Sequence, residues 1–138
     1  MPPVSVVIIT QNEADNIRNA LESVQWADDI IVVDSGSTDD TIQIAKQFTD
    51  RIVSHKWAGY GAQKNYGASL ATHDWILSLD ADEQLSSALT KEIHSLLENE
   101  PTVRGYRMPR VTHYLGQWIR TTDWYPDYQL RLYDRRVA

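Results

Sequence analysis

The residues best suited to chemistry form an acid cluster from Asp80 to Glu83, which places three carboxylates within four positions. This cluster follows an apolar run of strand length, Trp75 to Leu79, so it should lie where a strand ends. Carboxylates crowded together repel one another unless a cation shares them, and Mg²⁺ and Mn²⁺ take oxygen ligands of this kind. A motif this short is also common in solvated turns that cap a helix, so the rest of the chain must distinguish the two roles.

Three other roles for an acid cluster conflict with its surroundings. A calcium-binding EF-hand loop that starts at Asp80 needs glycine at its sixth position and glutamate at its twelfth, where Leu85 and Lys91 stand. A phosphatase-type aspartate nucleophile belongs on the first strand, whereas three predicted strands precede this one. A dinucleotide-binding oxidoreductase needs a glycine-rich turn after its first strand, and Thr10 to Glu13 contains no glycine.

Strands and helices should alternate through most of the chain. Val4 to Thr10 is nearly continuous in β-branched residues, which is typical of a strand buried on both faces of a parallel sheet. Asn12 is expected to cap the first helix, and Thr38 or Asp39 the second. Further strands are expected at Ile30 to Val33, Arg51 to His55 and Trp75 to Leu79. Helices are expected at about Glu13 to Val24, over a segment with Ile42, Ala45 and Phe48 on its apolar face, and at about Ala62 to Leu70. A last helix should begin at Ser86 or Ser87 and stop at Asn99-Glu100-Pro101.

The pattern changes after Pro101. Gly105 to Thr112, Gln117 to Arg120 and Gln129 to Tyr133 are typical of strands without helices between them. We expect this segment to pack over the carboxyl ends of the parallel strands. The predicted fold class is α/β: a mostly parallel, Rossmann-like sheet flanked by helices, with a smaller mixed β segment at the C-terminal end.

Polar side chains follow three of the predicted parallel strands at the points where these strands end. In a parallel sheet such ends share one edge, so one crevice can collect the side chains. This convergence supports a ligand site more strongly than any of the motifs alone. The candidates are Thr10, Asn12 and Glu13 after the first strand, Asp34 and Asp39 after the second, and Asp80 and Asp82 after the fourth.

The charge balance argues against a nucleic-acid-binding surface, because 13 lysines and arginines face 19 acids and give a net charge of −6. Seven arginines nevertheless lie between Arg104 and Arg136, which suggests a basic rim near an anionic acceptor or membrane surface. The absence of cysteine excludes disulfides and thiolate metal sites. No apolar run reaches membrane-spanning length, so we expect a cytoplasmic protein, with peripheral contact at the cytoplasmic face of the inner membrane left open.

Four segments, in this order and spacing, resemble the family 2 glycosyltransferases of the GT-A fold: T-Q-N-E at Thr10 to Glu13, V-V-D-S-G-S-T-D-D-T at Val32 to Thr41, G-Y-G-A-Q-K-N at Gly59 to Asn65 and L-D-A-D-E at Leu79 to Glu83. W-I-R at Trp118 to Arg120 and W-Y-P-D-Y-Q-L-R-L at Trp124 to Leu132 are similar to the bacterial subgroup that adds sugars to the lipopolysaccharide core. The resemblance covers essentially the whole chain. It implies an inverting, metal-dependent transfer of a hexose from a UDP-sugar donor to a lipopolysaccharide-core or related glycan acceptor, which can be lipid-linked.

The resemblance places the nucleoside of the donor beside the first two strand ends. Thr10, Asn12, Glu13 and Asp34 would border it. Asp34 would accept a hydrogen bond from the uracil imide. Asp39 would hold the base or order the turn before it, and its alternative role is that of a helix cap.

The resemblance places the diphosphate and its cation toward the acid cluster. Lys64, near the start of a predicted helix, would approach the diphosphate, although a solvated helix lysine has the same pattern. Asp80 would face the ribose or support the metal, and Asp82 would bind Mn²⁺ or Mg²⁺. A cation held by carboxylates offsets the negative charge that gathers on a departing diphosphate.

An inverting transfer needs a carboxylate that takes the proton from the acceptor hydroxyl. Asp127 is the candidate within this chain, although an aspartate beside Pro126 is also typical of a turn. Because family members are typically longer, we expect one truncated glycosyltransferase domain, with the nucleotide-sugar-binding half at residues 1–100 and the start of the acceptor-side half at 101–138. Two alternatives stay open: a donor-binding fragment without turnover because the catalytic-base segment is missing, and a nucleotidyltransferase on a similar sheet.

Overall fold

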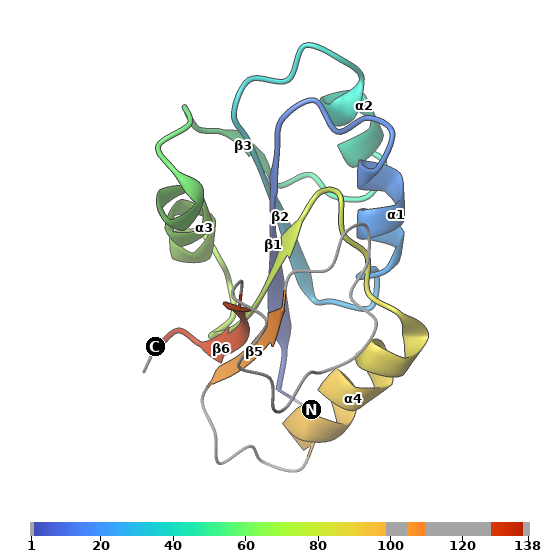
Figure 1. The fold of residues 1–138 in the computed structure, drawn as a ribbon, viewed down its shortest axis with the longest axis vertical. Coiled ribbons are helices and arrows are strands. Elements are labelled where there is room, and N and C mark those ends of the chain that lie inside the picture. The colour runs from blue at the N-terminus through green and yellow to red at the C-terminus, as the bar shows by residue number, and fades with distance from the viewer. Residues whose placement is uncertain (1, 99–104, 110–127, 137–138) are drawn as a thin grey trace.

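The computed structural model describes residues 2–98, 105–109 and 128–136. These residues form one six-stranded sheet with the order β3-β2-β1-β4-β6-β5 (Figure 1). The strands are β1 (Val4–Thr10), β2 (Asp29–Asp34), β3 (Ile52–Ser54), β4 (Trp75–Asp80), β5 (Gly105–Pro109) and β6 (Tyr128–Asp134). β1 to β4 run parallel, whereas β6 is antiparallel to β4 and β5 is antiparallel to β6. The predicted α/β class, with a mixed β segment at its C-terminal end, is confirmed.

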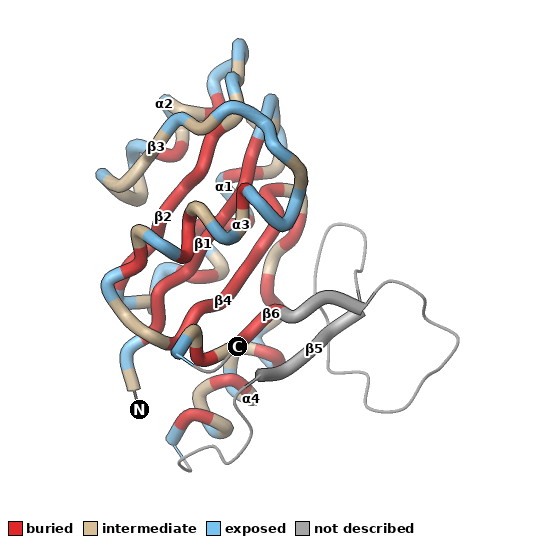
Figure 2. The backbone as a smooth tube through the Cα atoms, turned by 90° about the vertical axis from the view of Figure 1, so that its left-hand side faces the viewer, coloured by how far each residue is buried: buried red, intermediate tan, exposed pale blue. Residues whose placement is uncertain are grey.

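Helices cover both faces of the sheet, and in the described residues they are α1 (Ile17–Glu22), α2 (Thr41–Ala45), α3 (Tyr60–Ser69) and α4 (Ser87–Glu98). One face packs against α1, α2 and α4 through a core that includes Ile8 and Leu21. The other face packs against α3 through Val7 and Ala68. Figure 2 shows β1, β2 and β4 as continuously buried backbone, which explains their unbroken apolar sequences. Of the helices just named, none has the length and hydrophobicity needed to cross a membrane.

The parallel register brings the carboxyl ends of β1, β2 and β4 to one edge of the sheet. Thr10 lies opposite Asp34 in the β1–β2 pair, and Ile9 lies opposite Asp80 in the β1–β4 pair. The segments that follow these three strands therefore start side by side, as the polar residues at the strand ends led us to expect.

Two helices begin at positions that differ from the predictions. α1 begins at Ile17 instead of Glu13, so Asn16 and not Asn12 stands at its N-cap position. The backbone of Asn12 is left-handed, with a φ of 53°. The amides of Asn12 and Glu13 instead donate to the side chains of Ser37 (2.8 Å) and Thr41 (2.9 Å), so this segment stays irregular for a further turn. α3 begins at Tyr60 instead of Ala62.

The two described strands of the C-terminal segment extend the sheet rather than lie over its strand ends. β6 pairs with the first half of β4, where Trp75 lies opposite Asp134 and Leu77 lies opposite Leu132. β5 then pairs with the outer side of β6. Pairing of this kind satisfies the backbone groups at the edge of β4, which accounts for the position of the segment. The strand predicted at Gln117 to Arg120 lies outside the described residues.

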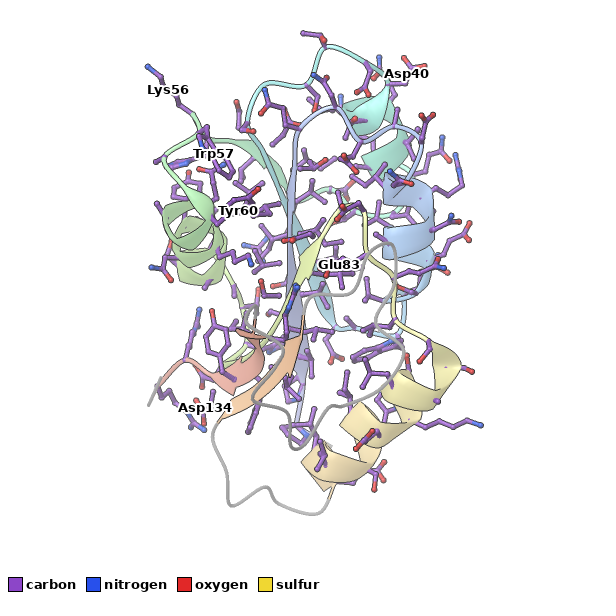
Figure 3. The ribbon with its side chains drawn as sticks, in the orientation of Figure 1. Asp40, Lys56, Trp57, Tyr60, Glu83 and Asp134 are labelled. Atoms are coloured by element: carbon purple, nitrogen blue, oxygen red, sulfur yellow. The ribbon has the colours of Figure 1, made fainter. Side chains whose placement is uncertain are left out.

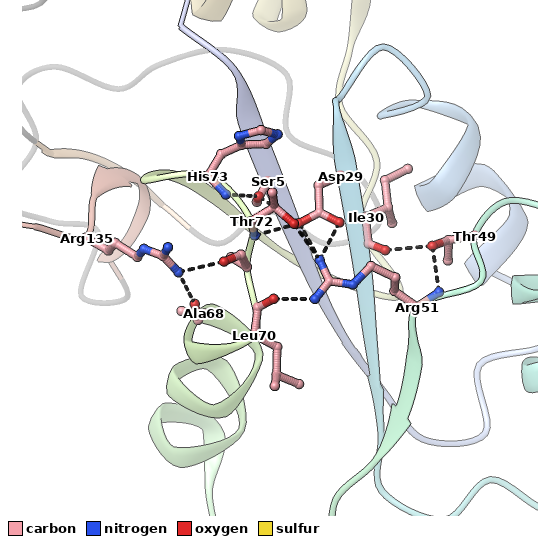
Figure 4. A network of polar contacts seen from close by, with 11 residues as sticks. Ser5, Asp29, Ile30, Thr49, Arg51, Ala68, Leu70, Thr72, His73 and Arg135 are labelled. Carbon is pink, nitrogen blue, oxygen red and sulfur yellow. Dashed lines mark hydrogen bonds and ion pairs between the residues drawn. The ribbon is translucent and has the colours of Figure 1, made fainter.

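A polar network ties β1, β2 and β3 to the segment before β4 at the amino edge of the sheet (Figure 4). Asp29 accepts two hydrogen bonds of 2.7 Å from Arg51 Nη1. It also accepts hydrogen bonds from Ser5 Oγ (2.9 Å) and from the Thr72 amide (3.0 Å). Burial alone would raise the pKa of the Asp29 carboxyl, but these hydrogen bonds outweigh it and the pKa is lowered. The network fixes the relative positions of the strands at this edge.

Helix α3 lies close against the sheet because Gly67 has no side chain. A Cβ atom at Gly67 would overlap Val7 Cγ1 and would lie 3.0 Å from Val33 Cγ2. A Cβ atom at Gly61, in the same helix, would meet nothing within 4 Å. The distance between α3 and the sheet therefore depends on Gly67.

Gly67→Ala should lower the free energy of unfolding by roughly 1–3 kcal/mol, the usual cost of overpacking a core. Gly61→Ala is the matched control and should leave stability unchanged or raise it by up to about 1 kcal/mol, because alanine favours a helix. Urea unfolding followed by circular dichroism measures both. Equal stability of Gly67→Ala and the unmodified chain would contradict the close packing of α3.

Candidate functional site

A cavity of about 280 Å³ opens at the carboxyl edge of the sheet, between the ends of β1 and β4 and the start of α3. We call it the carboxyl-edge crevice. Open α/β sheets bind ligands at this edge, beyond the carboxyl ends of their strands. Its lining combines acidic, hydroxyl and aromatic side chains, among them Thr10, Glu13, Ser35, Trp57, Tyr60, Asp80 and Asp82.

The structure brings four of the predicted site residues into the lining of the carboxyl-edge crevice: Thr10, Glu13, Asp80 and Asp82. Lys64 reaches Asp80 from α3. Asn12, Asp34 and Asp39 hold the loops after β1 and β2. Asp127 lies outside the described residues. The ligand contacts expected of all these residues stay predictions.

Asn12 and Asp39 join the loop after β1 to the loop after β2. Asn12 Oδ1 accepts a hydrogen bond from the Thr38 amide at 2.7 Å. Asp39 accepts hydrogen bonds from the amides of Ala14 (3.2 Å) and Thr41 (3.0 Å). A hydrogen bond from the Thr41 hydroxyl is the main reason that the pKa of the exposed Asp39 carboxyl is lowered. Both side chains thereby order the loops that border the crevice.

Asp34 shapes the turn that follows β2. It is only 2 % exposed, and its Oδ2 accepts hydrogen bonds from the amides of Gly36 (3.0 Å) and Ser37 (2.9 Å). Gly36 has a φ of 109°, a conformation that glycine adopts without strain. The Asp34 carboxylate thus holds a tight turn beside the crevice, and its hydrogen bond to a uracil imide stays a prediction.

Glu13 adds a carboxylate to the acidic side of the crevice. Burial raises the pKa of the Glu13 carboxyl, a hydrogen bond from Asn16 opposes that rise, and repulsion from Asp82 adds to it. Glu13 and Asp82 therefore lie within electrostatic reach of each other. The acidic side of the crevice favours a cation over an anion.

Asp80 ends β4 and meets a lysine from the neighbouring helix. Its side chain is 7 % exposed, and its Oδ1 lies 3.7 Å from Lys64 Nζ. Lys64 is itself largely buried, with its side chain 17 % exposed. The lysine thus contacts the acid cluster directly, which the sequence spacing had not indicated.

Glu83, the third acid of the cluster, supports the turn instead of facing the crevice. Its two carboxylate oxygens accept hydrogen bonds of 2.7 and 2.8 Å from the fully buried guanidinium of Arg131 in β6. Glu83 Oε1 also accepts a hydrogen bond of 2.9 Å from the backbone amide of Asp80. Burial raises the pKa of the Glu83 carboxyl, and Arg131 opposes that rise. One member of the acid cluster is therefore bonded to a buried arginine, and it is the member to which the sequence analysis assigned no ligand.

The arginines at the end of the chain do not form an open basic rim where the structure describes their side chains. Arg131 is buried, Arg135 pairs with Asp74 at 3.2 Å, and Arg136 pairs with Asp134 at 2.7 Å. The other four of the seven lie where no side chain is described. These three arginines thus give no support to the expected contact with an anionic surface.

The crevice has an aromatic side that sequence reasoning missed. Trp57 and Tyr60 are 46 % and 54 % exposed, and their rings meet edge to face with centroids 4.9 Å apart. Both lie on the α3 side of the crevice (Figure 3). Exposed aromatic faces suit stacking on a planar base or a sugar ring. The available signal was the W-A-G-Y segment, in which Gly59, with a φ of 106°, directs the chain into α3.

Two carboxylates of the crevice fit a divalent cation that shares its ligands with a substrate. The described residues hold no group of three or more His, Asp or Glu side chains placed to bind a metal. Asp80 and Asp82 both line the crevice, and Mg²⁺ is commonly held by one or two carboxylates together with phosphate oxygens and water. The donor set therefore suits Mg²⁺ or Mn²⁺ in the presence of a bound diphosphate.

The fold and the crevice define an α/β protein with an open, mostly parallel sheet and a carboxylate-lined crevice at its carboxyl edge. A family model described as glycosyl transferase family 2 matches residues 5–136, and the chain belongs to that family.

Curated relatives share this sequence over part of their length. An uncharacterized glycosyltransferase of Rickettsia felis is 49 % identical over 94 residues, which are 67 % of this chain and 33 % of that protein. The lipopolysaccharide core biosynthesis glycosyltransferase LpsC of Rhizobium meliloti is 32 % identical over 119 residues, which are 83 % of this chain and 44 % of that protein. The chain thus spans less than half the length of these relatives.

A solved structure supports the fold. Glucosyl-3-phosphoglycerate synthase of Mycobacterium tuberculosis, in complex with Mn²⁺, UDP and glucosyl-3-phosphoglycerate, has a TM-score of 0.64 and 23 % identity. The match covers 78 % of this chain and 43 % of the synthase chain. The predicted GT-A fold is confirmed by this likeness.

Glu83→Leu should lower the free energy of unfolding by roughly 3–5 kcal/mol, because it leaves the buried Arg131 guanidinium without its counter-charge. The double variant Glu83→Leu with Arg131→Met should recover much of that loss, since apolar side chains of similar size replace both charges. Glu98→Leu, an exposed position of α4, is the control. Urea unfolding measures the stability of all three variants. A Glu83→Leu variant as stable as the unmodified chain would contradict the structural role of the Glu83–Arg131 pair.

Glu13→Gln should raise the midpoint of thermal unfolding at pH 7, because burial and repulsion from Asp82 disfavour the charged form of the Glu13 carboxyl in the folded chain. The pKa of Glu13 is raised in the folded chain, so the native state loses stability as the pH rises from the unfolded pKa, about 4.3, through the folded pKa. The gain should therefore shrink toward about pH 4. Glu22→Gln, at an exposed position of α1, is the control. A gain of equal size at both pH values would argue against this electrostatic origin.

Proposed function

We propose that this chain is the nucleotide-sugar-binding part of a metal-dependent inverting glycosyltransferase, which transfers a hexose from a UDP-sugar to a lipopolysaccharide-core or related glycan acceptor. The observation that carries the proposal is the carboxyl-edge crevice, which joins Asp80 and Asp82 with the aromatic rings of Trp57 and Tyr60. Family membership supports the reaction class. We further propose that residues 1–100 form the donor-binding half and residues 101–138 the start of the acceptor-side half.

The strand order supports one orientation of the proposed donor in the crevice. β3, β2, β1 and β4 lie next to one another in that order, so the segments after β3 and β4 flank the crevice from opposite sides. Trp57 follows β3, and Asp82 follows β4. A planar base suits the aromatic side, and a diphosphate with its cation suits the carboxylate side. The nucleoside would then lie over Thr10 and Ser35, between the aromatic side and the carboxylate side of the crevice.

The residues of this chain would supply binding and charge. Asp82 and Asp80 would hold Mn²⁺ or Mg²⁺, which when bound supplies positive charge against the departing diphosphate. Lys64 would contact the diphosphate. Asp127 would act as the base that accepts the proton of the acceptor hydroxyl, so that direct displacement inverts the sugar carbon. The nucleoside would be bordered by Thr10, Asn12, Glu13, Asp34 and Asp39.

The acceptor is proposed from the name of one relative. The Rhizobium meliloti relative is named for lipopolysaccharide core biosynthesis, and this name suggests a core glycan as the acceptor. A lipid-linked glycan would place the enzyme in the cytoplasm, in peripheral contact with the inner membrane. We keep this location as part of the proposal.

Two other functions predict different behaviour. A donor-binding fragment without turnover would bind UDP in the same crevice but would transfer no sugar to an added acceptor. A nucleotidyltransferase would prefer a nucleoside triphosphate to UDP. Family membership favours the glycosyltransferase over the nucleotidyltransferase.

Calorimetric titration should show that UDP binds this chain with Mn²⁺ and much more weakly with a chelator. Asp82→Ala should weaken the Mn²⁺-dependent binding by at least about tenfold, or ~1.4 kcal/mol, because it removes a cation ligand. Asp127→Ala should bind UDP like the unmodified chain but should lose any transfer to an added acceptor. Asp50→Ala, an exposed acid near the amino edge of the sheet, is the control.

Equal loss of UDP binding in Asp82→Ala and Asp127→Ala would contradict the separation of a donor-binding half. Absence of UDP binding with Mn²⁺ and with chelator alike would refute the donor site itself. Tighter binding of UTP than of UDP would favour the nucleotidyltransferase.

A further inference from the structure

Two cation–carboxylate pairs hold the turn after β4, and they differ in geometry. At one end of the turn, Glu83 accepts hydrogen bonds of 2.7 and 2.8 Å from buried Arg131. At the other end, Asp80 faces Lys64 at 3.7 Å, a distance beyond hydrogen-bond length. Short, paired hydrogen bonds between charged groups are strong, whereas an ion pair at a longer distance is weaker and more readily exchanged. The Lys64–Asp80 pair is thus the one that a ligand can open.

The backbone that carries Lys64 is fixed, so motion is left to its side chain. The neighbouring Gln63 is buried, and its Nε2 donates to the carbonyl of His55 at 3.2 Å. One turn further along α3, Gly67 lies directly against Val7 of β1. A lysine carries a compact charge on a flexible stem, so Nζ can change partners while the helix stays in place.

Lys64 contacts the acidic side of the carboxyl-edge crevice, which contains Glu13, Asp80 and Asp82. Its ammonium group offsets part of that negative charge. For the same reason it repels a divalent cation that approaches Asp80. A diphosphate that enters the crevice offers the lysine a partner with more negative charge than one carboxylate.

On the basis of the proposed function, we propose that Lys64 stays paired with Asp80 until a diphosphate binds, and so takes the place of the metal ion at Asp80 in the unliganded chain. In the unliganded chain the Lys64–Asp80 pair lowers the affinity of the crevice for a divalent cation alone. When the donor binds, Lys64 turns to the diphosphate and leaves Asp80 available to Mn²⁺ or Mg²⁺. Nucleotide and cation therefore strengthen each other's binding by the same factor.

Titration of Mn²⁺, followed through the electron paramagnetic resonance signal of the free ion, tests this inference with and without saturating UDP. The unmodified chain should bind Mn²⁺ weakly alone and at least about tenfold more tightly with UDP. Lys64→Met should bind Mn²⁺ alone at least about fivefold more tightly than the unmodified chain, and should bind UDP in chelator more weakly. Lys64→Arg keeps the charge and should keep the weak binding of Mn²⁺ alone. Lys56→Met, an exposed lysine that points away from the crevice (Figure 3), should change neither affinity.

Equal Mn²⁺ affinities of Lys64→Met and the unmodified chain, with UDP binding intact, would overturn the role of Lys64 and leave the proposed function standing. Absence of UDP binding by the unmodified chain with Mn²⁺ would instead refute the proposed function, and this inference with it. Mn²⁺ binding by the unmodified chain that is as tight without UDP as with it would also overturn the inference. That last comparison needs no variant, so it can overturn the inference even if Lys64→Met does not fold.

Discussion

The buried ion pair between Arg131 and Glu83 is the interaction on which the position of the candidate site depends. Its two hydrogen bonds join β6 to the turn after β4, and Glu83 also accepts the amide of Asp80. Burying two charges costs free energy that their attraction offsets only when the geometry is good, so such a pair contributes little net stability. We interpret its role here as specifying one arrangement of the chain. That arrangement is the turn that brings Asp80 and Asp82 to the crevice.

The same pair makes the C-terminal antiparallel segment part of the site. β6 pairs with the first half of β4 through its backbone, while the Arg131 side chain reaches the carbonyl of Ser78 and the carboxylate of Glu83 at the far end of β4. α3 contributes a second cation, Lys64, to the same turn. The acid turn is therefore held by two elements that lie on either side of it in the sequence. A change in β6 would therefore alter the turn through Glu83, and a change in α3 would alter it through Asp80.

The architecture could be predicted because burial on both faces leaves a strong signature in the sequence. Every residue of β1 is buried, which requires the unbroken apolar run that identified this strand. In α4, Leu89, Ile93 and Leu97 are buried as their spacing predicted, and Leu96 is half-buried. The meeting of Thr10 and Asp80 at one edge follows from parallel pairing alone. The strand topology was therefore enough to predict which strand-end residues lie together at the site.

The roles of individual acids could not be predicted, because they depend on partners distant in the sequence. Asp82 and Glu83 are adjacent and chemically alike, yet Asp82 lines the crevice while Glu83 is 2 % exposed and bonded to Arg131, 48 positions away. Asn12 has the composition of a helix cap, but its side chain bonds to Thr38, 26 positions on. Spacing locates a residue at a strand end, and the elements that pack behind it decide whether it faces a ligand. An acid cluster thus divides into ligand-facing and supporting members, and a buried arginine on a nearby strand identifies the supporting one.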